Sequence, residues 1–138
     1  MTPLYTASAV ATGDGRNGHV TSTDGILDLD VRIPKEMGGA GGATNPEQLF
    51  AAGYAACFHS ALRLVAGQAG ADVSESEVVA DVSIGTNDAG GFTLAVQLEV
   101  TLPNVDHDQA EQLVGQAHQV CPYSNATRGN IEVTLTVE

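Results

Sequence analysis

The sequence contains no tryptophan, and its only aromatic residues are three tyrosines and three phenylalanines. Hydrophobic residues make up 43% of the chain, and most of them are alanine and valine. The core must therefore form from close helix and sheet contacts rather than around large aromatic side chains. A chain of 138 residues is long enough to bury such a core without disulfide or metal staples. We therefore predict one domain that spans residues 1–138.

Positive charge is also scarce, with five basic residues against seventeen acidic ones and a net charge of -12. A surface with this balance repels phosphates, which argues against nucleic acid and anionic membranes as partners. Any site that needs a positive charge must take it from one of five side chains: Arg16, Arg32, Lys35, Arg63 and Arg128.

Targeting signals and long apolar runs are missing as well. Residues 1–10 lack the basic start and apolar run of a secretory signal, and no segment reaches the ~18 uninterrupted apolar residues of a membrane span. We therefore expect a cytoplasmic protein. In a reducing compartment the only two cysteines, Cys57 and Cys121, are more often buried thiols, metal ligands or redox-catalytic residues than a structural disulfide.

Alternation of apolar and polar residues predicts six strands. Leu27, Leu29, Val31 and Ile33 alternate with charged residues, so we expect one face of that strand to be buried. Two later strands, joined by a turn at residues 87–91, should form a hairpin. The six predicted strands cover residues 4–12, 19–22, 27–33, 78–84, 94–102 and 131–137.

The peptide Asn-Pro-Glu-Gln at residues 45–48 has the features of a helix start, with the asparagine as N-cap and the proline in the first helical position. This helix should run from about residue 46 to residue 68. Because residues 49–62 are apolar or small almost all round, we expect burial on most sides. A single chain of this size would struggle to cover the helix, which favours a dimer.

A second helix should begin at Asp106 and carry an apolar stripe that ends at Cys121. Pro122 either ends this helix or opens a short new one that Gly129 caps. The predicted order is three strands, a helix, two strands, two helices and a final strand, so hairpins and helices are separate along the chain. This order predicts an α+β fold with antiparallel sheets.

We expect both cysteine thiols to point into the core and toward each other, and the simplest interpretation is that they are small buried hydrophobic residues. A reactive interpretation needs a cation near Cys57, because burial alone raises the pKa of a thiol. Arg16, on a glycine-rich loop, is the best candidate, although it also suits an ordinary exposed turn. Glu47 either favours the positive end of the helix dipole or holds Arg16 in a bidentate pair.

Metal and nucleotide sites are weaker alternatives. Cys57, His59, His118 and Cys121 are residue types that bind zinc, but residues 57 and 59 project from nearly opposite sides of a helix. The glycine run at residues 38–42 lacks the Lys-Ser/Thr ending of a phosphate-binding loop. We therefore predict neither a metal nor a cofactor.

Two long motifs carry a family resemblance. The stretch NPEQLFAAGYAACF at residues 45–58 and the stretch HQVCPYSNATRGN at residues 118–130 resemble the organic hydroperoxide resistance (Ohr) proteins of the Ohr/OsmC superfamily. The opening LYTA at residues 4–7 and the glycine run extend the resemblance over essentially the whole chain. It implies an OsmC-like intertwined homodimer, in which antiparallel sheets wrap two central helices and each active site draws on both subunits.

The resemblance also implies a cysteine-based peroxidase for organic hydroperoxides. In that interpretation Cys57 is the peroxidatic cysteine, Cys121 resolves it to a Cys57–Cys121 disulfide, and Arg16 with Glu47 activates the thiolate. The reductant would be a lipoylated protein or dihydrolipoamide. One alternative stays open: Cys121, just before Pro122, could sit at a helix N-terminus, where a thiol is acidified, and the two roles would then be exchanged.

An apolar lining offered by Phe50, Tyr54 and Met37 would favour bulky alkyl or fatty-acid hydroperoxides. Two other function classes remain open. The chain could be an acidic dimeric binding protein with two packing cysteines, or a redox sensor that forms the same disulfide. The sensor ranks lower because the sequence has no visible output module such as a DNA-reading helix.

Overall fold

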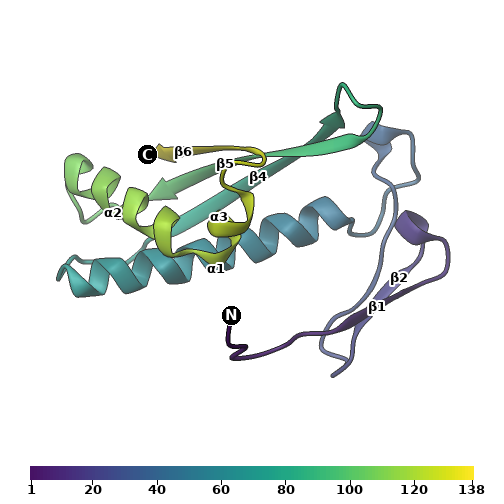
Figure 1. Cartoon of the computed structure of the whole chain (residues 1–138), viewed down its shortest axis with the longest axis horizontal. Helices are drawn as coiled ribbons and strands as arrows, with labels where there is room; N and C mark the ends of the chain where they lie inside the picture. The colour runs from purple at the N-terminus through teal and green to yellow at the C-terminus, as the bar shows by residue number, and fades with distance from the viewer. The chain divides into compact units, whose positions relative to one another are not determined.

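Strands and α-helices follow one another in the predicted order, with two short 3-10 helices added (Figure 1). The computed structural model describes all 138 residues. They divide into two compact units, Met1–Leu49 (the N-terminal unit) and Phe50–Glu138 (the C-terminal unit), and each unit contains one three-stranded sheet. The predicted α+β class is confirmed, whereas the single domain over residues 1–138 stays a prediction.

The sheet of the N-terminal unit is an antiparallel meander of β1 (Ala9–Thr12), β2 (His19–Ser22) and β3 (Asp28–Asp30). The 3-10 helices η1 (Gly15–Asn17) and η2 (Lys35–Met37) lie in the loops after β1 and β3. β1 begins later than the predicted strand at residues 4–12 because its ladder with β2 starts only at Ala9.

One expectation for β3 and its flanks is wrong within this chain. Leu27 and Leu29 are exposed, at 46% and 37%, and of the apolar residues predicted to form a buried face only Val31 is fully buried. The N-terminal unit holds a single small sheet and no long helix or second sheet to pack on it. Its own residues therefore leave this apolar face uncovered.

The sheet of the C-terminal unit contains a long hairpin of β4 (Glu77–Thr86) and β5 (Phe92–Thr101), as predicted. The last strand, β6 (Glu132–Val137), pairs with β5 in parallel, so the expectation of purely antiparallel sheets needs correction. Between β5 and β6 the chain passes through helices α2 (His107–Val120) and α3 (Pro122–Thr127). Two parallel neighbours cannot be joined by a tight turn, and the helical crossover is what lets β6 run in the same direction as β5.

The long helix α1 (Pro46–Gln68) has the predicted bounds. The Asn45 side chain accepts a hydrogen bond of 2.8 Å from the Gln48 backbone N–H, which confirms the predicted cap. Burial on most sides is not observed, because the sheet and α2 cover only one face of α1 and leave Leu64 53% exposed. By length and composition alone α1 could cross a membrane, but the core helix of a soluble protein passes the same test.

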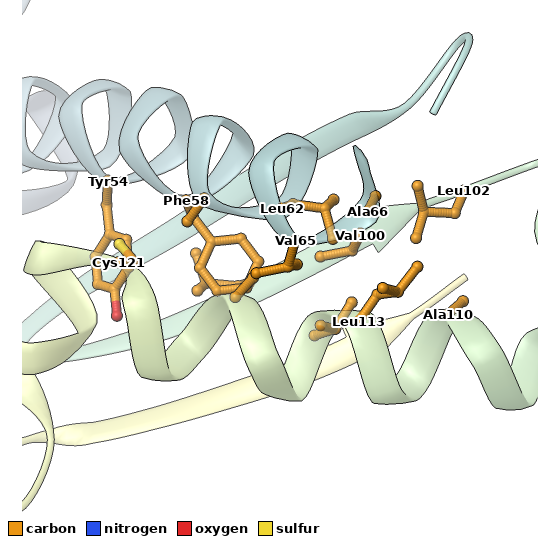
Figure 2. Packing of buried hydrophobic residues seen from close by; sticks show 14 of the residues in the cluster. Tyr54, Phe58, Leu62, Val65, Ala66, Val100, Leu102, Ala110, Leu113 and Cys121 are labelled. Atoms are coloured by element: carbon orange, nitrogen blue, oxygen red, sulfur yellow. The ribbon is translucent and has the colours of Figure 1, made fainter. Parts of the chain in front are cut away.

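The main core lies between α1, β5 and α2 (Figure 2). Of the two possibilities for Pro122, the structure has the second: it opens the short helix α3, and Gly129 follows with a positive φ of 77°. Asp106 caps α2 by accepting a hydrogen bond from the Gln109 backbone N–H. The largest fully buried core side chains of this unit are Tyr54, Phe58, Leu62, Leu98, Val100 and Cys121.

Candidate active site

The two cysteines meet inside the C-terminal unit. Cys57 lies in the middle of α1 and is half-buried, whereas Cys121 is fully buried at the junction where α2 ends and α3 begins. Their side chains interact directly, and neither is in a disulfide. The expectation that both thiols point into the core and toward each other is confirmed.

The surroundings of Cys57 disfavour its thiolate. Burial raises the pKa of the Cys57 thiol above its ordinary value, and the adjacent Cys121 side chain raises it further. One group acts in the opposite direction: a hydrogen bond from the Tyr123 backbone lowers the same pKa. A nucleophilic Cys57 therefore needs a stronger source of positive charge than its own unit supplies here.

Arg16 and Glu47 form a bidentate ion pair in the N-terminal unit. Nη1 of Arg16 donates to Oε2 of Glu47 at 2.9 Å, and Nη2 donates to Oε1 at 2.8 Å. The hydrogen bond from Arg16 holds the pKa of the Glu47 carboxyl below its ordinary value, and Glu47 in turn raises the pKa of Arg16. The predicted pair is thus present, with Arg16 more exposed than Glu47.

Two side chains, Asn17 and Arg32, fix the backbone around Arg16. Asn17 accepts a hydrogen bond of 3.1 Å from the Ile33 N–H, and Nη1 of Arg32 donates to the Gly18 carbonyl at 2.9 Å. A side chain at Gly18 would overlap the carbonyl oxygen of Thr12. The close Thr12 carbonyl explains the glycine at position 18, and the two hydrogen bonds tie the Arg16 turn to the segment after β3.

The predicted substrate-binding residues fall into two groups. Phe50 and Tyr54 lie together on α1 and share an aromatic cluster with Tyr123 of α3, with ring centroids 5.6 to 6.0 Å apart. Tyr54 is fully buried, and Phe50 is half-buried. Met37, in η2 of the N-terminal unit, is partly exposed. Gly53 makes room for Tyr123, because an added Cβ would lie 2.8 Å from the Tyr123 hydroxyl.

A buried polar network beneath the aromatic cluster was missed by the sequence analysis. The Tyr54 hydroxyl lies 2.8 Å from Ser124 Oγ and 3.2 Å from Thr127 Oγ1, and Ser124 Oγ lies 2.8 Å from Nδ1 of His118. No sequence signal indicates that the hydroxyls of Ser124 and Thr127 turn inward. Burial and the charge of Arg128 lower the pKa of His118.

The residue types weighed for zinc are engaged elsewhere. Nε2 of His59 pairs with Ser76 Oγ at 2.8 Å, and His118 pairs with Ser124. No group of three or more His, Cys, Asp or Glu side chains has an arrangement suited to a metal ion.

Comparison with known proteins identifies the class to which this fold and cysteine pair belong. The sequence model described as OsmC-like protein matches residues 39–136, and the chain belongs to that family. Within it, the chain belongs with the organic hydroperoxide resistance proteins. The protein of that name from Xanthomonas axonopodis pv. citri (strain 306) is 54% identical over 136 residues, which cover 97% of this chain and 94% of the relative.

Solved structures agree with this assignment. A crystal structure of an organic hydroperoxide resistance protein from Elizabethkingia anophelis, with crystallant-derived thiocyanate bound, is 56% identical and has a TM-score of 0.95, covering 100% of this chain and 99% of that one. The organic hydroperoxide resistance protein OhrB of Bacillus subtilis is 46% identical with a TM-score of 0.90, covering 99% and 100%. The family resemblance in the sequence is confirmed, together with the fold.

Proposed function

We propose that this protein is a thiol peroxidase that reduces organic hydroperoxides to alcohols and so takes part in resistance to them. The observation that carries the proposal is the direct interaction of the Cys57 and Cys121 thiols next to an aromatic cluster. A disulfide between two cysteines needs Cα atoms within about 7 Å and side chains that face each other, and the interaction of these two thiols supports such a bond. The names of the relatives supply the substrate class.

In the first step the Cys57 thiolate attacks one oxygen of the peroxide bond. The O–O bond breaks, the sulfur becomes a sulfenic acid, and the second oxygen leaves with a proton as an alcohol. Arg16 supplies the positive charge that Cys57 lacks in its own unit, by stabilising the thiolate and the charge on the departing oxygen. Glu47 holds the guanidinium in one orientation through the two hydrogen bonds described above.

In the second step Cys121 condenses with the sulfenic acid. A Cys57–Cys121 disulfide forms and water leaves, so one equivalent of hydroperoxide consumes both thiols. An external dithiol, a lipoylated protein or dihydrolipoamide, then reduces the disulfide. A cytoplasmic location fits this cycle because a reducing compartment returns both cysteines to the thiol form.

Substrate selectivity follows from three apolar side chains of the proposed site. Phe50, Tyr54 and Met37 offer apolar contacts to a bulky alkyl group, whereas hydrogen peroxide gains nothing from them. We expect cumene hydroperoxide to react faster than hydrogen peroxide by at least about tenfold, the equivalent of ~1.4 kcal/mol of apolar contact. Equal second-order rate constants for the two peroxides would contradict this selectivity.

The proposal includes a homodimer. The outer face of α1 leaves Leu64 exposed, and the N-terminal unit leaves Val10, Leu27 and Leu29 exposed. A second copy of the chain would cover these side chains. Light scattering after gel filtration should give twice the monomer mass of 14.1 kDa. A monomeric mass at micromolar concentration would refute the dimer.

The experiment that tests the proposed function is intact mass and free-thiol titration before and after one equivalent of cumene hydroperoxide. The reduced wild type should lose two thiols and about 2 Da, as formation of one disulfide requires. Cys57→Ser should keep its remaining thiol. If the wild type keeps both thiols, the cysteines only pack the core and the peroxidase proposal fails.

A further inference from the structure

The hydroxyl of Tyr54 lies at the centre of a buried chain of hydrogen bonds that joins α1 to α2 and α3. It contacts Ser124 Oγ and Thr127 Oγ1, and Ser124 Oγ also contacts Nδ1 of His118. Tyr54 and Ser124 are fully buried, and Thr127 is nearly so. A polar group in the core is costly unless it is paired, so a tyrosine whose hydroxyl is this well satisfied holds its neighbours in place.

The direction of these hydrogen bonds follows from counting protons. The Thr127 hydroxyl has one proton, which it donates toward the carbonyls of Tyr123 at 3.0 Å and Ser124 at 3.2 Å, so it must accept from Tyr54. Because the Tyr54 proton is then committed, Ser124 donates to Tyr54 and accepts from Nδ1–H of His118. A single chain of donors thus runs from α2 through α1 and ends on the backbone carbonyls of Tyr123 and Ser124 in α3.

This chain ends at the residue whose backbone faces the attacking cysteine. The Tyr123 backbone acts on Cys57 against the effect of burial by lowering the pKa of its thiol, and Tyr123 lies in the first turn of α3, two residues after Cys121. The Tyr54 network therefore anchors the same turn that supplies the Tyr123 N–H. Three other ionisable side chains belong to this junction: Cys121, His118 and Arg128, whose guanidinium donates to the His118 carbonyl.

We propose that Tyr54 is a positioning residue for the attacking cysteine: its hydroxyl anchors Ser124 and Thr127 and so holds the Tyr123 N–H against the Cys57 sulfur. The inference rests on the proposed thiol-peroxidase function and adds to it a second activating group, independent of Arg16. It also gives Tyr54 a role other than lining the substrate pocket.

The variant that tests this role is Tyr54→Phe, read out by the pH dependence of Cys57 alkylation with iodoacetamide and resolved from Cys121 by peptide mass. The variant should fold, because Thr127 keeps its carbonyl acceptor and Ser124 can donate to His118 once the imidazole proton moves to Nε2. We expect the midpoint of the alkylation profile to move to higher pH. The rate at neutral pH should fall about three- to tenfold, the usual effect of losing one hydrogen bond to a charged group.

The plateau of the alkylation rate at high pH separates positioning from loosened packing. It should stay unchanged in Tyr54→Phe, since the fully formed thiolate has the same access to the reagent. A change in the plateau with no shift of the midpoint would overturn the positioning role. Ser124→Ala breaks the same chain one bond earlier and must move the midpoint in the same direction.

Tyr5→Phe is the matched control, because it deletes a hydroxyl that is exposed and makes no hydrogen bond in the structure. Its alkylation profile should equal that of the wild type, and a shift as large as that of Tyr54→Phe would refute a specific role for Tyr54. The alkylation assay uses no peroxide. A wild type that ignores cumene hydroperoxide therefore refutes the peroxidase proposal, whereas an unshifted midpoint in Tyr54→Phe refutes the positioning role alone.

Discussion

The guanidinium of Arg16 meets the carboxylate of Glu47 through two parallel hydrogen bonds of 2.9 and 2.8 Å, in a chain that has only five basic residues. The two residues are far apart in sequence, and the pair sets the direction in which the guanidinium plane faces. An arginine held this way keeps its charge in one place, which an exposed and mobile arginine does not.

Glu47→Gln should therefore slow the reaction of the Cys57 thiol with cumene hydroperoxide. A glutamine keeps the shape but can no longer accept both hydrogen bonds as a charged partner, so Arg16 loses its fixed orientation. We expect a decrease of about tenfold in the second-order rate constant, one unit of thiol pKa. Glu36→Gln, in η2, is the control, because Glu36 is exposed and forms no ion pair. Equal rates in Glu47→Gln and wild type would remove the pair from the mechanism.

The same pair should appear in the pH dependence of stability. Arg16 lowers the folded-state pKa of Glu47, so its contribution to stability is present above about pH 4.3, the ordinary glutamate value, and is lost as the pH falls through the lower folded-state pKa. Urea unfolding of wild type and Glu47→Gln should differ more at pH 6.5 than at pH 3. Because Arg16 is more than a third exposed, the difference should stay below about 1 kcal/mol.

The local part of the fold could be predicted from the sequence because its signals are local. Asn45 and Pro46 mark the start of α1, and alternating residues mark the hairpin of β4 and β5; both features were found at their predicted places. The Arg16–Glu47 pair was also predictable, since the scarcity of basic residues left few candidates for a charged partner.

Long-range relations were harder to predict. The parallel pairing of β6 depends on how α2 and α3 carry the chain across the unit, which the alternation within β6 does not encode. The exposure of Leu29 and Leu64 depends on what else covers them, and an apolar pattern cannot show that. The Tyr54–Ser124 contact joins two helices, and serine and threonine in a short helix give no signal that their hydroxyls turn inward.

Gly18 should be sensitive to the smallest substitution. A methyl group there would overlap the Thr12 carbonyl oxygen, so Gly18→Ala must displace the backbone beside Arg16. We expect a loss of about 1–3 kcal/mol in the free energy of unfolding, the usual cost of overpacking, with slower peroxide reduction. Gly67→Ala, in α1, is the matched control, because nothing lies near its added Cβ and alanine favours a helix. A neutral Gly18→Ala would show that the loop adapts freely.

His118 should make the protein less stable in mild acid. Burial and Arg128 lower its folded-state pKa, so the unfolded chain binds a proton more readily, and stability should fall as the pH drops below about 6.5. His118→Asn, which retains a group able to pair with Ser124, should lose less in melting temperature between pH 8 and pH 5.5 than the wild type does. His19 is the control of opposite sign, since hydrogen bonds to Asp30 and Asp28 raise its pKa. His19→Asn should enlarge the acid loss, because the wild-type His19 contribution is present below about pH 6.5 and disappears as the pH rises.

The roles of the two cysteines can be separated by single serine substitutions. Cys121 lies beside Cys57 at the N-terminus of α3, so the exchange of roles that the sequence left open can be tested directly. If Cys57 attacks, Cys57→Ser should not react with cumene hydroperoxide, whereas Cys121→Ser should react once and gain about 16 Da as a sulfenic acid. Further peroxide should then carry that sulfur to the sulfinic acid, because no resolving thiol remains. The mass gain found in Cys57→Ser instead would assign the attack to Cys121, and it would leave the Tyr123 N–H serving the resolving thiol.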